Sequence, residues 1–263
     1  MDLKELKAEY SFRTWLRRMN LFVVGNVDFD RANILKLPQD KKASMAFEEQ
    51  ELDNWWYDHY KVFTRYASWH YLYAGLNCFD RFSKPSAFYA QQYLGRKKIK
   101  TIVDVGAGIG LSTMLLADLF PEAKVYYNNI SPSLQHSFFE SHKFYRTKCS
   151  GITPNEPEFI TEKEMLQHGS FDMLFASEYF EHFEDPMKQT DFLLTGCGFK
   201  YLVVNNSFGV KAYGHFDEFK VSTEAKPLAP KQMSKLWLKT VRSWYDELDV
   251  KCWNGRPKIF AKR

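Results

Sequence analysis

The sequence predicts an α/β protein with a doubly wound, mostly parallel sheet, preceded by a helical N-terminal extension. Three observations predict this class. From Lys100 onward, short apolar segments alternate with helical ones, a glycine-rich loop follows the first apolar segment, and a hairpin signal lies near the end of the chain. Of the 263 residues, 45% are hydrophobic, which is enough to bury a full core.

The expected strands and helices follow one another along the second part of the chain. KTIVDV is continuously apolar, as expected for a parallel strand that is buried on both faces. Further strands are expected in KVYYNNI, EPEFI, FDMLFAS and YLVVNNSF, with helices in LSTMLLADLF, from Ser133 to Arg146, in TEKEMLQH, in MKQTDFLLTG and from Pro230 to Arg242. The last two strands, DVKCW and PKIFAKR, flank Asn254 and Gly255, a strong hairpin signal. The expected sheet therefore has seven strands and ends in an antiparallel hairpin.

The sequence predicts two regions, an aromatic-rich helical cover over residues 1–95 and an α/β domain over residues 96–263. The stretch from Glu48 to Leu94 carries apolar and aromatic residues at helical spacing, and Pro85 is expected to open a helix after Ser83. No Gly/Ser/Pro-rich linker precedes Lys100. We therefore expect residues 1–95 to depend on the α/β domain for their folding.

Charge, cysteine content and hydropathy indicate which classes of partner, metal site and cell compartment the sequence favours. A net charge of +4 permits a nucleic-acid partner without arguing for one. The four cysteines are far apart and form no CxxC pair, which argues against a disulfide framework and a zinc site. The N-terminus lacks the apolar core of a signal peptide, and no apolar run is long enough to span a membrane. A cytoplasmic protein is expected; the sequence does not determine its oligomeric state.

The loop VDVGAGIGLST, from Val103 to Thr113, lies between an expected strand and an expected helix, where glycines let the backbone turn tightly and approach a ligand. It resembles motif I of class I S-adenosylmethionine (SAM)-dependent methyltransferases, whose fold also ends in an antiparallel hairpin. The resemblance implies SAM as the cofactor, with Gly106 and Gly108 facing its methionine part and Asp104 orienting the loop or the ammonium group. The full set of implied cofactor-binding residues is Asp104, Gly106, Ala107, Gly108, Gly110, Asn129, Ile130 and Ser177.

Asn129 departs from the family pattern. The second strand of such a fold should end in an acidic residue that binds both ribose hydroxyls, and Asn129 stands there, followed by Ile130 and a family-like Ser-Pro. An amide oxygen accepts a hydrogen bond from a hydroxyl but lacks the strength of a charged acceptor. The departure predicts weaker bonds to SAM. It also leaves open a methyltransferase-like fold without activity.

FDMLFASEYFEHFEDP contains an ExxEH sequence, formed by Glu178, Glu181 and His182, directly after the fourth expected strand. If this piece is helical, residues three and four apart share a face. Two carboxylates and an imidazole would then point together at the carboxyl end of the sheet, and these groups suit Mg²⁺, Mn²⁺ or a later first-row metal. The alternative is a histidine that packs or acts as a base without a metal.

The segment after the fifth expected strand contains GHFDEF, with His215 as the candidate fourth ligand. ExxEH together with this segment resembles two families, the ubiquinone-biosynthesis O-methyltransferases and the small-RNA 3′-terminal 2′-O-methyltransferases, and the second completes a two-Glu, two-His metal site with a later histidine. The resemblance covers roughly Lys100 to Arg263 and is absent from the first hundred residues. It implies a metal site of Glu178, Glu181, His182 and His215.

The leading hypothesis is an enzyme that transfers a methyl group from SAM to an acceptor hydroxyl with the help of a divalent metal. Its expected catalytic residues are His182, His215 and Glu178, with a histidine as the general base if no metal is bound. A small molecule with hydroxyl groups is the favoured acceptor, and a nucleotide or nucleic acid stays open. Two alternatives remain: a metal-free methyltransferase of a small molecule or a nucleic acid, and an inactive methyltransferase-like binding subunit.

Overall fold

The computed structural model describes residues 3–25, 72–95, 97–129, 136, 138–142, 156–210, 215–252 and 256–263. Its centre is a seven-stranded sheet of order β3-β2-β1-β4-β5-β7-β6. The strands are β1 (Thr101–Val105), β2 (Lys124–Asn128), β3 (Glu158–Phe159), β4 (Phe171–Ser177), β5 (Phe199–Asn205), β6 (Tyr245–Glu247) and β7 (Lys258–Lys262). β1 to β5 pair in parallel, whereas β7 is antiparallel to both β5 and β6. The predicted fold class is confirmed.

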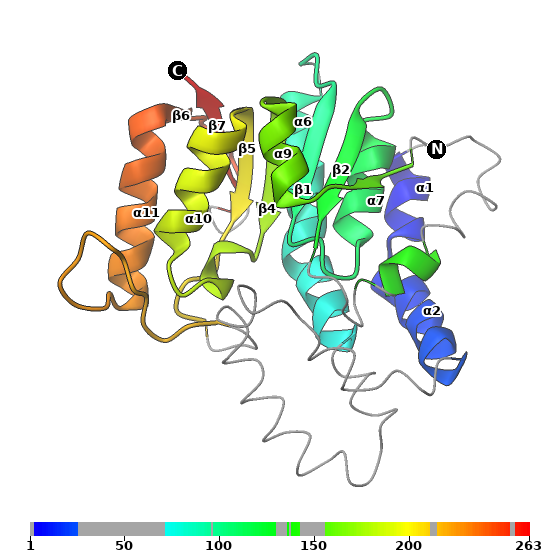
Figure 1. Cartoon of the computed structure of the whole chain (residues 1–263). Coiled ribbons are helices and arrows are strands. Elements are labelled where there is room, and N and C mark those ends of the chain that lie inside the picture. The colour runs from blue at the N-terminus through cyan, green and yellow to red at the C-terminus, as the bar shows by residue number, and fades with distance from the viewer. Residues whose placement is uncertain are drawn as a thin grey trace, which may run out of the picture.

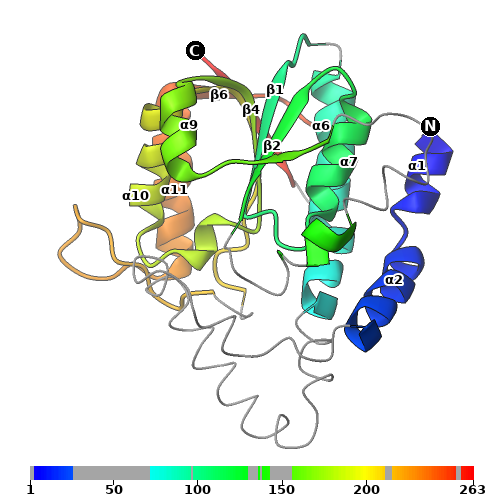
Figure 2. The same cartoon turned by 45° about the vertical axis from the view of Figure 1, so that its right-hand side comes forward.

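Helices cover both faces of the sheet (Figures 1 and 2). One face carries α9 (Glu162–His168), α10 (Pro186–Asp191) and α11 (Pro230–Trp244), and α10 continues into the π-helical segment η3 (Phe192–Cys197). The other face carries α6 (Lys84–Leu94) and α7 (Leu111–Leu119). α1 (Leu3–Glu9) and α2 (Phe12–Gly25) lie outside α6 and α7. Side chains of successive strand residues point alternately to the two faces of the sheet and pack against the helices there. Val103 and Leu174 pack with α9 to α11, while Ile102 and Phe175 pack with α6 and α7. This explains why the central strands carry apolar residues at successive positions.

The helix that contains Pro85 does not begin there, contrary to the prediction. Residues 72–78 are helical, the π-helical segment η1 (Phe79–Ser83) follows, and α6 continues to Leu94 without a break. The wider turn is closed by the N–H of Lys84, which donates to the carbonyl of Phe79. Proline, which lacks an N–H, is therefore accommodated next to a widened turn inside a longer helix, a common place for such irregularity.

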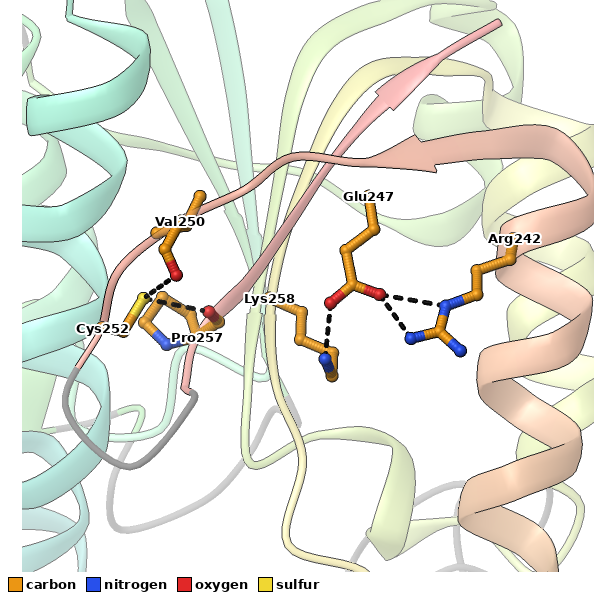
Figure 3. Close-up of polar contacts among 6 residues, drawn as sticks. All are labelled: Arg242, Glu247, Val250, Cys252, Pro257 and Lys258. Carbon is orange, nitrogen blue, oxygen red and sulfur yellow. Dashed lines mark hydrogen bonds and ion pairs between the residues drawn. The ribbon is translucent and has the colours of Figure 1, made fainter.

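The antiparallel end is present, but its sixth strand lies earlier than predicted. β6 begins directly after α11, and Tyr245 pairs with Lys262. The Tyr245 ring is buried, and its hydroxyl donates to the carbonyl of Phe199 at 2.8 Å. Glu247 receives hydrogen bonds from Arg242 and Lys258 (Figure 3). These tertiary contacts place the ladder before the DVKCW segment; Asn254 and Gly255 lie outside the described residues.

The described part of residues 1–95 shares a hydrophobic core with the sheet. Trp15, Leu76 and Phe79 belong to the same buried cluster as Leu115 and Phe138. The boundary between residues 95 and 96 stays a prediction. Of the predicted helix from Ser133 to Arg146, residues 136 and 138–142 are described, and they are helical. Within the part of the chain that the structure describes, no helix is long and apolar enough to cross a membrane.

Candidate functional site

The glycine loop lies where β1 ends and α7 begins. Gly106 and Gly110 have positive φ angles of 66° and 74°, which side-chain-bearing residues rarely adopt. A Cβ on Gly106 would lie 2.6 Å from the ring of Tyr179, and one on Gly110 would lie 2.0 Å from the ring of Phe139. Both glycines are therefore required by the protein's own packing, in addition to any role toward a ligand.

Asp104 lies near the end of β1 and is almost fully buried. One of its carboxylate oxygens accepts hydrogen bonds from Ser112 Oγ at 2.7 Å and from Thr113 Oγ1 at 2.6 Å. Burial raises the pKa of Asp104 to about 7, and the two hydroxyl bonds oppose that rise. Asp104 thus ties the end of β1 to the first turn of α7; its role toward a cofactor stays a prediction.

Asn129 follows β2 and contacts the same loop. Its amide nitrogen donates to the carbonyl of Gly108 at 2.8 Å, while the N–H of Ala107 donates to the carbonyl of Asn128 at 3.1 Å. The residue at the expected ribose position therefore holds the loop in place. Ser177, at the end of β4, accepts a hydrogen bond from Ser83 Oγ at 3.1 Å. Ile130, the remaining predicted cofactor contact, lies outside the described residues.

The ExxEH segment is not the single helical turn that the sequence predicted. Glu178 has a φ of 54°, a left-handed conformation that is costly for a residue with a side chain, and its N–H donates to the carbonyl of Asn205 at 2.6 Å. A short 3-10 helix, η2 (Phe180–His182), begins after it. The backbone turn, rather than helical spacing, brings Glu178 towards Glu181.

Glu178, Glu181 and His215 meet at the carboxyl end of the sheet. One ligand atom from each lies within 4.8 Å of the others, and all three residues are buried. His182 is not in that group, but its ring meets the ring of His215 edge to face with centroids 4.7 Å apart. Three of the four predicted metal ligands are therefore brought together, and the fourth lies beside them.

Burial dominates the electrostatics of this cluster. It raises the pKa of Glu178 and raises that of Glu181 well above its usual range, where the neighbouring Glu178 adds to the effect. Burial lowers the pKa of His215, whose bond to Val210 opposes that change. His215 Nδ1 lies 2.9 Å from the carbonyl of Val210, so Nδ1 carries the proton and Nε2 has a lone pair.

Three residues near the cluster were not singled out in the sequence. Ser207 Oγ donates to Glu178 Oε1 at 2.7 Å, and the N–H of Ser207 donates to Glu181 Oε1 at 2.6 Å. Arg256 donates to Ser207 Oγ, and its charge opposes the rise in the pKa of Glu178. Burial raises the pKa of the Cys78 thiol, and the nearby carboxylates of Glu178 and Glu181 raise it further. The sequence signals for Ser207 and Arg256 were weak: Ser207 lies near the end of the expected strand YLVVNNSF, and Arg256 directly precedes the expected strand PKIFAKR.

The fold is similar to that of methyltransferases of known structure. The small RNA methyltransferase HEN1 superposes with a TM-score of 0.50 and 15% identity, over 69% of this chain and 25% of that one. The methyltransferase domain of bacterial CtHen1 gives 0.47 and 13%, over 69% and 100% of the two chains. Magnesium protoporphyrin IX methyltransferase from Synechocystis PCC 6803 gives 0.46 and 14%, over 86% and 97%.

The chain has the class I methyltransferase fold. The strand order and the antiparallel end agree with this likeness, which at these identities concerns the fold alone. No protein-family profile and no curated protein sequence matches the chain.

Proposed function

We propose that this chain is a SAM-dependent methyltransferase that transfers a methyl group to an acceptor hydroxyl at a divalent-metal site. The observation that supports this most is the buried meeting of Glu178, Glu181 and His215 at the carboxyl end of a class I methyltransferase sheet. Ligands of open α/β folds bind at that edge. The structural relatives include a small RNA methyltransferase and a porphyrin methyltransferase, so the acceptor is open on that ground.

The cluster suits a divalent cation. Two buried carboxylates side by side need a cation or bound protons to offset their charge. Glu181 Oε2 is buried and has no hydrogen-bond partner among the described residues, which leaves one oxygen for such an ion. His215 contributes Nε2, because Val210 fixes the proton on Nδ1. Carboxylate oxygens and an imidazole suit Mg²⁺ or Mn²⁺, which would lower the pKa of an acceptor hydroxyl and orient it.

The loop between β1 and α7 suits SAM. Its backbone turns sharply at Gly106, and the N-terminal end of α7 points towards the same edge of the sheet as the cluster (Figure 1). Asn129 is joined to the loop and would offer its carboxamide oxygen to a ribose hydroxyl. Because this acceptor is neutral, each such bond would be weaker than one to a carboxylate.

The protein's own contribution to the transfer is alignment and proton removal. The acceptor oxygen forms a bond to the methyl carbon while the bond from carbon to sulfur breaks, and the hydroxyl proton leaves to a base. With a metal bound, Nε2 of His215 is a ligand, so a ring nitrogen of His182 would accept that proton; without a metal, Nε2 of His215 would be available as the base. Ser207 holds the Glu178 and Glu181 carboxylates in place through its hydroxyl and its N–H.

Binding measurements test this proposal before the acceptor is known. We expect the parent chain to bind S-adenosylhomocysteine (SAH), and then about one equivalent of Mn²⁺, in calorimetry. Glu181→Gln and His215→Ala should weaken Mn²⁺ binding at least about tenfold, since even changes to residues that support metal ligands often cost that much. The control is Glu184→Gln, which removes a carboxylate paired with Lys220 at 2.5 Å outside the cluster.

The outcomes separate the alternatives. A parent chain that binds neither SAH nor SAM would refute the methyltransferase proposal and favour another role for the fold. Binding of SAH without binding of Mn²⁺ would refute the metal and favour a metal-free transfer with a histidine base.

A further inference from the structure

Arg256 lies beside the acidic cluster although it is distant in sequence. β7 pairs antiparallel with β5, with Lys258 opposite Val204. The residues before Lys258 therefore lie beyond the carboxyl end of β5, the edge that carries the cluster. There Arg256 Nη1 donates to Ser207 Oγ at 2.8 Å. One hydroxyl group thus separates the guanidinium from Glu178, to which Ser207 donates at 2.7 Å.

Among the described residues, most of the hydrogen-bonding capacity of Arg256 is unused. A guanidinium has five N–H donors, and the bond to Ser207 uses one of them. Within the described residues, no carboxylate lies within ion-pair distance of Arg256. Arg242 differs, because its Nε and Nη2 both bind Glu247 (Figure 3). Arg256 is also solvent-exposed, so a ligand can reach it.

The end of β5 holds a second unused polar group. Both polar atoms of the Asn206 side chain are shielded from solvent and have no partner among the described residues. Asn206 directly precedes Ser207, which binds Arg256. Shielded polar groups are nearly always hydrogen-bonded, so such an amide indicates a partner beyond the described residues, and a bound ligand is one that can reach this end of the sheet.

The charges around Arg256 indicate the chemical class of a ligand that would bind at this end of β5. Glu178 and Glu181 would offset a divalent ion, and the histidines are neutral when they bind a metal. Arg256 acts on Glu178, but with a divalent ion bound the charges of the described cluster, two carboxylates, the ion and Arg256, would leave one positive charge in surplus. A surplus positive charge beside a reacting hydroxyl attracts an anionic molecule, and the planar guanidinium suits the paired oxygens of a phosphate or a carboxylate.

We propose that Arg256, held in place by its bond to Ser207, forms a subsite for an anionic oxygen group of the methyl acceptor, a phosphate or a carboxylate close to the hydroxyl that is methylated. This proposal rests on the proposed function, which places the acceptor at the cluster. The opposing explanation is that Arg256 serves only to offset the charge of Glu178, in which case the protein has no affinity for small anions there.

Thermal unfolding with small anions distinguishes the two explanations. The parent, Arg256→Gln, Arg256→Lys and the control Arg242→Gln are titrated with inorganic phosphate and, separately, with acetate, in SAH and Mg²⁺ at constant ionic strength. Phosphate or acetate should raise the Tm of the parent and of Arg242→Gln in a saturable way. The fitted Kd should be about tenfold weaker or more in Arg256→Gln. Arg256→Lys should recover little of it, because lysine lacks the planar fork.

The two anions identify the chemistry. If phosphate binds more tightly than acetate through Arg256, the group on the acceptor is a phosphate; if acetate binds more tightly, it is a carboxylate. The subsite would be overturned if the anions caused no saturable rise in the Tm of the parent. It would also be overturned if Arg256→Gln showed the same rise as the parent, which is the result expected for an anion bound only through the metal. SAH and Mn²⁺ titrations of the parent are independent of these outcomes, so a failure of the proposed function is recognised separately.

Discussion

At the scale of single residues, Asp104 shows how burial changes the chemistry of a side chain. It accepts two hydroxyl bonds at the start of α7, yet burial raises its pKa from 3.8 to about 7. The folded protein therefore holds a proton on Asp104 up to a higher pH than the unfolded chain does. The resulting contribution to stability is complete below about pH 4 and is lost as the pH rises to about 7.

Asp104→Asn tests this directly, because the amide has the same shape and does not titrate. The free energy of unfolding of the parent, relative to that of Asp104→Asn, should fall between pH 4 and pH 7 and stay constant above that range. The upper limit of the fall is on the order of 4 kcal/mol. Urea unfolding across this range measures it, with the exposed Asp246→Asn as the control. A difference that does not change with pH would show that Asp104 titrates normally.

At the scale of elements, Asp172 joins three strands at the edge of the sheet opposite the cluster. One carboxylate oxygen of Asp172, in β4, accepts hydrogen bonds from the N–H groups of Lys100 and Thr101 at 2.6 and 3.1 Å. The other binds Lys200 Nζ, from β5, at 2.6 Å. β1, β4 and β5 carry the glycine loop, the ExxEH segment and Ser207 at their far ends. Asp172 therefore fixes the strands whose ends build the site.

Asp172→Ala should lower the free energy of unfolding by about 2 kcal/mol, since it leaves backbone donors without their charged acceptor. Asp246→Ala is the matched control: it removes an exposed pair with Arg263 and should change stability by less than about 0.5 kcal/mol. Urea unfolding of both variants gives the comparison. Equal effects would mean that Asp172 contributes no more than a surface ion pair.

At the scale of the whole molecule, the described N-terminal helices belong to the core of the sheet. Trp15, from α2, is 3% exposed and packs against Phe138 and His142. Tyr10 donates from its hydroxyl to Asp118, a residue of α7, at 2.6 Å. The prediction that residues 1–95 depend on the α/β domain therefore has a specific test.

Trp15→Ala should lower the stability of the entire chain by about 3 to 5 kcal/mol, in a single unfolding transition. Trp244→Ala is the control, because Trp244 is 50% exposed. A chain that begins at Arg96 should bind a dye specific for exposed apolar surface and lose affinity for SAH. Two separate transitions, or a soluble shortened chain that binds SAH as the parent does, would show that the N-terminal region is an independent unit.

Local patterns in the sequence were sufficient for much of the fold. β4 has the predicted bounds because FDMLFAS is mostly apolar and ends where polar residues begin. The glycine loop was predictable because the glycines at 106 and 110 meet a steric need that no other residue satisfies. The parallel arrangement followed from the alternation of strands and helices, since parallel strands require crossover connections.

The sequence by itself thus determined most of the elements, the glycine loop and the residue types of the candidate site. Only the tertiary structure decided which of those residues meet. Glu178 reaches Glu181 through a left-handed backbone turn, His215 enters from a separate loop, and Arg256 reaches Ser207 through the β5–β7 register. The start of β6 at Tyr245 likewise followed from burial and pairing across the sheet. Such contacts join segments far apart in the chain, and their geometry depends on how strands register and pack, which local spacing does not encode.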